Sequence, residues 1–221
     1  MHNREEYIKQ LEAIISKFLE PLKGIPYPIA IRALTGCEVL HFDLSCGDNQ
    51  KLLNLLKNAA KIAGNEAYKQ GIFTRRPNEA GNHIEPFVIS ALRKVGLRAD
   101  KPRTKSGKIK VAGYPDIEII DKQGRVIYLD CKTYNTATKN QSFRTFYFSP
   151  SKDPKITKDA FHLLLSFELT REERKGQIAF IPISWQLYTL ENLKVQVKHE
   201  FNASNKDLYK PEFLLARGKI K

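Results

Sequence analysis

The chain has 221 residues, of which 42% are hydrophobic and 28% charged, so it can form one sizeable domain and is not disordered throughout. Lysine and arginine number 37 against 24 acidic residues, for a formal net charge of +13. A field of this sign attracts polyanions, most often nucleic acid, although some proteins are merely basic. Three cysteines without metal-ligand spacing, a charged start and no membrane-length apolar run lead us to expect a cytoplasmic protein.

Helical periodicity dominates the first part of the chain. Apolar residues from Tyr7 to Leu22 predict a helix that ends at "PLKGIPYP". Asp48 is a candidate cap for a second helix over 49–70. A third helix is predicted to begin near residue 83, which would put Pro86 in its first turn. Its apolar stripe consists of Ile84, Phe87, Val88, Ala91, Leu92 and Val95.

From residue 101 onward the apolar period changes to two, which is typical of strands. The predicted strands are 115–120, 125–133, 143–149, 162–169, 177–183 and 193–201, and 153–161 is a candidate short helix. Helices followed by strands predict an α+β fold, sandwich-like, with N-terminal helices packed on a central mixed sheet of five to six strands. We expect one domain over 1–221, with a mainly helical part (1–80) and a catalytic core with C-terminal recognition elements (81–221).

Acidic and basic side chains share one face of the hairpin predicted over 115–133. Asp130 and Lys132 lie two residues apart on the second arm, and a paired first arm brings Asp116 beside them. "DKQG" (121–124) has the composition of a turn. Two converging carboxylates favour a hard cation such as Mg²⁺ or Mn²⁺ between them, and an ammonium beside it suits phosphodiester hydrolysis. The alternative is a surface hairpin with solvated charges.

These residues resemble a known signature. Pro115-Asp116, thirteen intervening residues and Asp130-Cys131-Lys132 resemble the PD-(D/E)XK nucleases, whose best-known members are type II restriction endonucleases. The resemblance implies a restriction-endonuclease-like core in which Asp116, Asp130 and the backbone carbonyl of Cys131 bind Mg²⁺, with Mn²⁺ able to substitute. It also implies that Lys132 serves the attacking water or the scissile phosphate.

A fourth residue is implied by its place on the preceding helix. Family members often carry a glutamate there that supports the metal shell, and Glu85 in "GNHIEPFV" stands in that place. Its alternative role is that of a first-turn acid favoured by the helix dipole. Two further acid-x-Lys triplets, at 153–155 and 173–175, do not look like strand sites, because the first contains proline and the second lies in a very polar stretch.

Basic and polar side chains near the hairpin are candidates for contact with DNA. "KPRTKSGKIK" (101–110) holds five cations just before the site, against the alternative of a solvated loop. Arg144 follows the second arm, and a polar stretch near residue 204 is suited to reading base edges or to forming a capped turn. The candidates are Lys105, Lys108, Lys110, Arg144, Asn202, Ser204, Asn205 and Lys206.

Together these features predict a Mg²⁺-dependent type II restriction endonuclease that cuts double-stranded DNA and leaves 5′-phosphates. We expect a homodimer, because one chain offers one metal site and two strands need two. The resemblance also implies a prokaryotic cytoplasm and a cognate DNA methyltransferase in the host. Two alternatives are a structure-specific nuclease, such as a junction resolvase or repair enzyme, and a non-catalytic DNA-binding protein on a nuclease scaffold.

Overall fold

The computed structural model describes residues 2–20, 22–74, 80–135, 146–174, 176–197, 204 and 210–213. The chain divides into two compact units, Met1–Ile25 with Val195–Lys221, and Pro26–Lys194. In the first unit the predicted helix is present as α1 (His2–Leu19), and a short 3₁₀ helix η3 (Pro211–Phe213) lies in the C-terminal segment. No helix in the described ranges is both long enough and apolar enough to cross a membrane.

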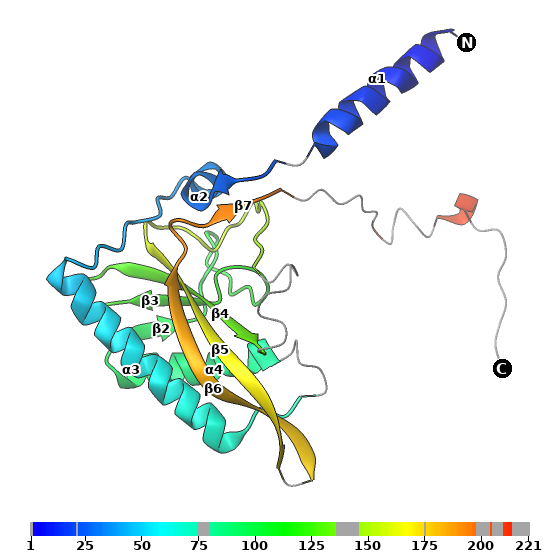
Figure 1. The fold of residues 1–221 in the computed structure, drawn as a ribbon. Coiled ribbons are helices and arrows are strands. Elements are labelled where there is room, and N and C mark those ends of the chain that lie inside the picture. Colours follow the sequence, from blue (N-terminus) through cyan, green and yellow to red (C-terminus); the bar gives the residue numbers. More distant parts are fainter. Residues whose placement is uncertain are drawn as a thin grey trace. The chain divides into compact units, whose positions relative to one another are not determined.

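The second unit contains three helices and a five-stranded sheet within its described residues (Figure 1). The helices are α2 (Tyr27–Thr35), α3 (Gly47–Gln70) and α4 (Ala80–Lys94). The strands, in sheet order, are β2 (Arg98–Asp100), β3 (Ile117–Ile120), β4 (Val126–Tyr134), β5 (Phe161–Arg174) and β6 (Gln177–Thr189). All neighbours pair antiparallel except β4 and β5, which are parallel. The predicted α+β fold with a mixed sheet is confirmed.

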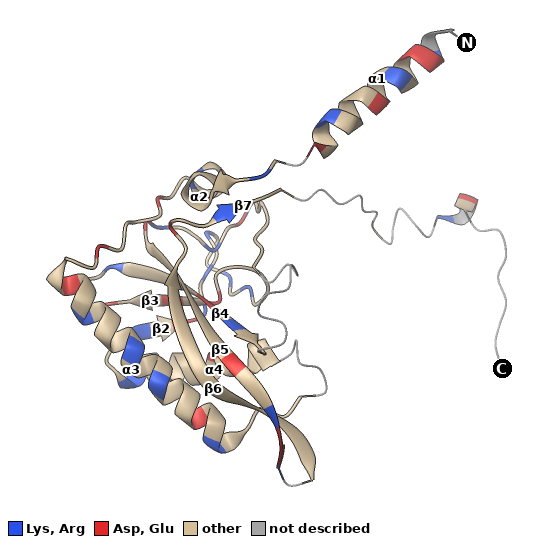
Figure 2. Cartoon of the chain, viewed as in Figure 1, with Lys and Arg blue, Asp and Glu red and all other residues tan. Residues whose placement is uncertain are grey.

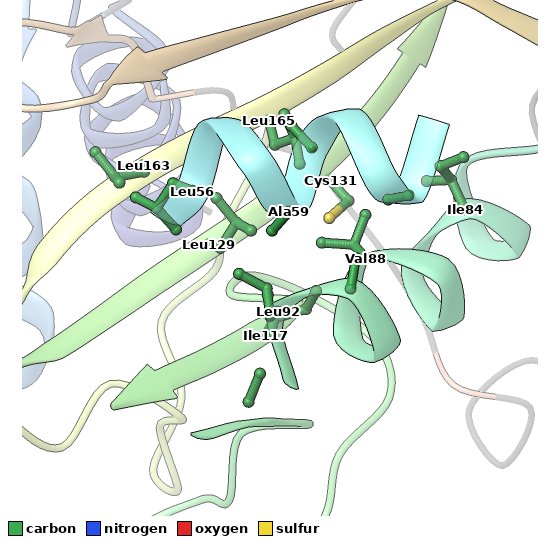
Figure 3. Packing of buried hydrophobic residues seen from close by; sticks show 14 of the residues in the cluster. Leu56, Ala59, Ile84, Val88, Leu92, Ile117, Leu129, Cys131, Leu163 and Leu165 are labelled. Carbon is green, nitrogen blue, oxygen red and sulfur yellow. The ribbon is translucent and has the colours of Figure 1, made fainter. Parts of the chain in front are cut away.

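Helices α3 and α4 cover the apolar face of this sheet (Figure 3). On α4, Ile84, Val88 and Leu92 are buried, as the predicted stripe requires. They meet Ile117 and Leu129 from the middle of the sheet. Small residues of α3, among them Ala59, Ala60, Ala63 and Ala67, let its backbone approach closely. The exposed side of α3 carries lysines (Figure 2). The opposite face of the sheet carries polar side chains, among them Asp130 and His162, which are also buried.

Several predicted boundaries are wrong. Helix α4 is present from Ala80, so Pro86 lies inside it and not in a first turn. Helix α3 begins at Gly47, which places Asp48 within its first turn. Residues 146–149 are not a strand, and 153–160 form no helix. Of the last predicted strand, 193–201, only β7 (Lys194–Val195) is present, and it pairs with β1 (Ile25–Pro26). The remainder of 193–201 is irregular or outside the described residues.

Candidate active site

The β3–β4 hairpin forms as predicted and sets the register of the site. Ile117 pairs with Leu129, and the Asp116 N–H donates to the Leu129 carbonyl (3.1 Å), so Asp116 stands opposite Asp130. The turn between the strands is closed by Asp121, whose backbone N–H donates to the Arg125 carbonyl and whose carboxylate accepts hydrogen bonds from the backbone N–H and the Nε–H of Arg125. Gly124 has a φ of 80°, which glycine adopts without strain. The hairpin thus fixes both acids on one face of the sheet.

Asp116 is held by the opposite strand. Its Oδ2 accepts a hydrogen bond of 2.9 Å from the backbone N–H of Cys131. The main chain between Asp130 and Lys132 is therefore tied directly to the carboxylate of Asp116. Because Asp116 is half-buried, this carboxylate also keeps an open side.

Asp130 is the most constrained charge in the site. Its side chain is 2% exposed, and Lys132 Nζ lies 2.6 Å from its Oδ2. Oδ2 is buried, and beyond this ion pair it has no hydrogen-bond partner among the described residues. Burial raises the pKa of Asp130 to about 7, with Lys132 opposing that rise and Asp116 adding to it. Such a carboxylate gains from an added cation.

Cys131 lies between two residues of the polar face, but its own side chain belongs to the apolar core. Its thiol is buried and points into the apolar cluster (Figure 3), where burial raises its pKa well above the ordinary value. Its neighbours in the chain point to the opposite face, as strand alternation requires. Only the backbone of Cys131 is therefore available to the site.

Glu85 has a partner that the sequence did not reveal. Its carboxylate is buried and forms an ion pair with Lys101, which follows β2. The positive charge of Lys101 also opposes the rise that burial causes in the pKa of Cys131. The structure thus shows Glu85 neutralised by Lys101 beside the site. Its predicted metal role stays a prediction.

An aromatic cluster lies on the same face of the sheet as Asp130. His162 on β5 pairs in register with Tyr128 on β4, and its Nδ1 lies 2.8 Å from the Tyr27 hydroxyl and 2.7 Å from that of Tyr114. Burial lowers the pKa of His162 to about 3, so the ring is neutral. Burial also raises the pKa of both tyrosines, and the negative charge of Asp130 adds to that rise. This cluster supports the floor of the site.

A basic groove of about 640 Å³ opens at the β2 edge of the sheet. It is lined by β2, β3 and the loop 101–109, and Glu118 on its wall is two residues from Asp116 on the same face. Its basic lining residues are Arg93, Arg98, Lys101, Arg103, Lys105 and Lys158. Asp116, Asp130 and Lys132 are not among the lining residues, so the groove is distinct from the three proposed catalytic side chains.

The predicted basic loop is structured. Arg103 pairs with Ile109, and the Thr104 N–H donates to the Lys108 carbonyl (2.8 Å). Lys105 lines the groove, Lys108 is exposed on the same loop, and Lys110 lines a smaller cavity of about 60 Å³. Of the other predicted contacts, only Ser204 is described, and it is exposed; Arg144, Asn202, Asn205 and Lys206 lie outside the described residues.

Comparison with known proteins identifies the family. The model of the type II restriction enzyme MjaV family matches residues 21–212. The chain belongs to this family. The type II restriction enzyme MjaV of Methanocaldococcus jannaschii is 38% identical over an alignment of 232 residues, which covers 98% of this chain and 99% of that protein.

Membership of the type II restriction enzyme MjaV family confirms the predicted enzyme class. The chain is a restriction endonuclease, that is, a site-specific endodeoxyribonuclease, and DNA is its partner. This rules out the non-catalytic alternative and favours sequence recognition over recognition of branched structures. The identity of the catalytic residues, the metal and the assembly are separate questions.

Proposed function

We propose that this restriction endonuclease is a Mg²⁺-dependent enzyme of the PD-(D/E)XK type, with Asp116, Asp130 and Lys132 as its catalytic set. The observation that carries the proposal is the buried Oδ2 of Asp130, which finds no hydrogen-bond partner in the described part of the chain and faces Asp116 across the hairpin. A buried carboxylate oxygen in that state is costly, and such atoms mark functional sites.

The donor set fits Mg²⁺. This ion is commonly held by one or two carboxylates, with water and substrate phosphate completing its shell. Asp116, Asp130 and the carbonyl of Cys131 supply such a set, and the described residues contain no cluster of three or more acidic, histidine or cysteine side chains that would suggest a larger metal site. Because Mn²⁺ accepts the same oxygen ligands, we expect it to substitute.

Each residue then has a defined task. Bound Mg²⁺ would supply positive charge that acidifies a water molecule and stabilises charge on the phosphate. Asp116 and Asp130 would hold that charge in place. Lys132, whose side chain is 31% exposed, would reach the attacking water or the scissile phosphate while remaining near Asp130. In-line attack of the water on phosphorus would break the P–O3′ bond, so the products would be a 5′-phosphate and a 3′-hydroxyl.

Glu85 would support the metal shell once DNA is bound. Its partner Lys101 lines the basic groove, so a phosphate in the groove would compete with Glu85 for the ammonium. Release of Lys101 would restore the negative charge of Glu85 beside the two acids.

The groove and the basic loop offer a path for the DNA backbone. Arg98 and Lys105 are exposed groove residues whose side chains make no ion pair or hydrogen bond within the described residues. We propose that they bind phosphates together with Lys108 and Lys110. Arg144, Asn202, Ser204, Asn205 and Lys206 remain proposed DNA contacts.

Cleavage of both strands calls for two metal sites, and the described residues of one chain offer one such set. We therefore propose that the enzyme acts as a homodimer, with two copies related by a two-fold axis that matches the symmetry of duplex DNA. A host that makes this enzyme would need a methyltransferase acting on the same sequence to protect its own DNA.

The direct test is incubation of the purified chain with bacteriophage DNA in Mg²⁺ or in EDTA, beside Asp130→Ala and a control, Asp48→Asn, on the exposed side of α3. We expect discrete fragments that require Mg²⁺, persist in the control and disappear in Asp130→Ala. Fragments that a ligase rejoins without prior phosphorylation would carry 5′-phosphates. Unaltered cleavage by Asp130→Ala would refute the proposed site.

Two further measurements test the remaining parts. Sedimentation at working concentration should give twice the chain mass of 25.3 kDa. A purely monomeric enzyme that cuts both strands would contradict the dimer. Selective nicking of branched DNA, with intact linear duplex, would favour the junction-resolving alternative.

A further inference from the structure

The segment Asp153–Lys155 contacts two loops of the site. The carboxylate of Asp153 accepts hydrogen bonds from the N–H and the hydroxyl of Ser106 (2.8 and 2.7 Å). The carbonyl of Pro154 accepts one from the N–H of Lys105 (2.9 Å). Both partners belong to the basic loop 101–110, so this loop is fixed to a segment that follows much later in the chain.

Lys155 fixes the second loop, which leads into Asp116. Its side chain is 5% exposed, and its Nζ donates to the carbonyls of Gly113 (2.6 Å), Pro115 (2.9 Å) and Val111 (3.5 Å). An ammonium has three N–H donors, and three backbone acceptors account for all of them. A buried charge is tolerated only when its hydrogen bonds are satisfied in this way.

The peptide unit between Pro115 and Asp116 is consequently held at both ends. Lys155 binds its carbonyl, and the Leu129 carbonyl accepts its N–H. The orientation of that peptide determines where the Asp116 side chain points. Lys155 therefore positions the Asp116 side chain indirectly, through the hydrogen bond of its ammonium to the main chain.

We propose that Asp153, Pro154 and Lys155 form a brace that holds Asp116 in register with the basic loop, with Lys155 as a positioning residue. The inference rests on the proposed metal role of Asp116. Lys155 is not a second catalytic lysine, because its three donors are used and its ammonium is buried. The brace thus links the basic loop 101–110, which is proposed to bind phosphate, to Asp116, which is proposed to bind the metal.

The first test compares Lys155→Met with Lys152→Met, an exposed lysine of the same segment. Amide hydrogen exchange of Gly113, Tyr114 and Asp116 needs no activity and should be about tenfold faster in Lys155→Met, because methionine offers the carbonyls no N–H donor. In cleavage assays kcat should fall on the order of 10- to 100-fold, with a higher Mg²⁺ requirement and little change in KM for DNA. Lys152→Met should behave as the unmodified chain.

Asp153→Asn tests the other half of the brace. It should accelerate exchange at Lys105 and Ser106 and raise KM, while kcat changes by less than about twofold, because Lys155 still holds the Asp116 loop. Should Lys155→Met not fold, Lys155→Gln, which retains two N–H donors, replaces it with an intermediate effect expected.

Two results would overturn the brace: unchanged exchange at Gly113, Tyr114 and Asp116 in the Lys155 variants, or faster exchange with unaltered kcat and Mg²⁺ requirement. Failure of the proposed function appears differently. In that case the unmodified chain would cut DNA without a divalent cation, or Asp116→Asn would remain active, whereas the exchange data would still report whether Lys155 holds the loop.

Discussion

The ammonium of Lys132 lies 2.6 Å from Oδ2 of Asp130, yet that oxygen is buried and accepts no hydrogen bond from any described residue. When ionised, Asp116 and Asp130 carry two negative charges against the single positive charge of Lys132, so the set lacks one positive charge. A cation that binds there would gain a carboxylate that the protein has already desolvated. Without a bound cation, the enzyme should accordingly have a lower free energy of unfolding than the same chain without this buried charge.

Asp130→Asn should stabilise the metal-free protein at pH 8 while abolishing cleavage. The pKa of Asp130 is about 7 when folded, against an ordinary value of 3.8. Between these values the folded chain binds more protons than the unfolded chain, so this group's stability contribution falls as pH rises. Asparagine removes this destabilisation, which is worth on the order of a few kcal/mol.

Thermal unfolding in EDTA measures this effect. The gain of Asp130→Asn should be large at pH 8 and smaller at pH 5. It should be absent in Asp48→Asn, because the pKa of that exposed carboxylate is lowered by its hydrogen bond from Lys51. An equal change at both pH values would show that the pKa of Asp130 is not raised.

Lys132→Met should lower both stability and rate. The ammonium opposes the rise that burial causes in the pKa of Asp130, so its removal leaves the buried carboxylate uncompensated at pH 8. We expect single-turnover cleavage to fall on the order of 100-fold or more. Lys132→Arg keeps the charge, so it should recover the unfolding temperature more fully than the rate. Full activity of Lys132→Met would exclude Lys132 from the chemistry.

Variants of the Glu85–Lys101 pair distinguish a structural role of Glu85 from a role at the metal. Lys101→Met leaves Glu85 buried without its partner and should cost on the order of 2 kcal/mol of stability, which Glu85→Gln in the same chain should restore. A supporting role at the metal predicts more, namely that Glu85→Gln raises the Mg²⁺ concentration for half-maximal cleavage. Restored stability with an unchanged Mg²⁺ requirement would leave Glu85 purely structural.

Neutralising the groove should weaken DNA binding without sequence preference. For Arg98→Gln combined with Lys105→Gln, the slope of log K against log salt should become shallower by about 0.9 for each phosphate that the variant no longer binds. The affinity of the variant for cognate and for non-cognate duplexes should decrease by similar factors, as measured by fluorescence anisotropy across a salt series. A decrease confined to the cognate duplex would instead indicate base recognition. Lys51→Gln on α3 is the matched control.

The hairpin was predictable because its signals are local. Alternation over 115–133 fixes which side chains share a face, and the composition of 121–124 fixes the turn, so Asp116, Asp130 and Lys132 come together as expected. The α4 stripe is equally local. Where the chain combines proline with short apolar runs, the same reasoning fails. Helix α2 begins among prolines and buries only Tyr27 and Ile31.

The partners of site residues were not predictable, because they depend on tertiary contacts. Lys101 reaches Glu85 only because the very short strand β2 joins the sheet beside β3. Lys155 binds backbone carbonyls, which carry no sequence signal, from a distant part of the chain. The Asp-Pro-Lys triplet at 153–155 was correctly set aside as a strand site, but nothing in its composition indicates that it contacts the loops of the candidate site.

Position 131 lies beside the proposed metal site through its main chain and in the apolar core through its side chain. A carbonyl oxygen is the same in every residue type. The volume and hydrophobicity of the side chain should therefore limit which residues position 131 tolerates. Valine or alanine in place of cysteine would leave the carbonyl ligand unchanged. The two-sided geometry of the β-strand would thus allow several residue types at the centre of the motif.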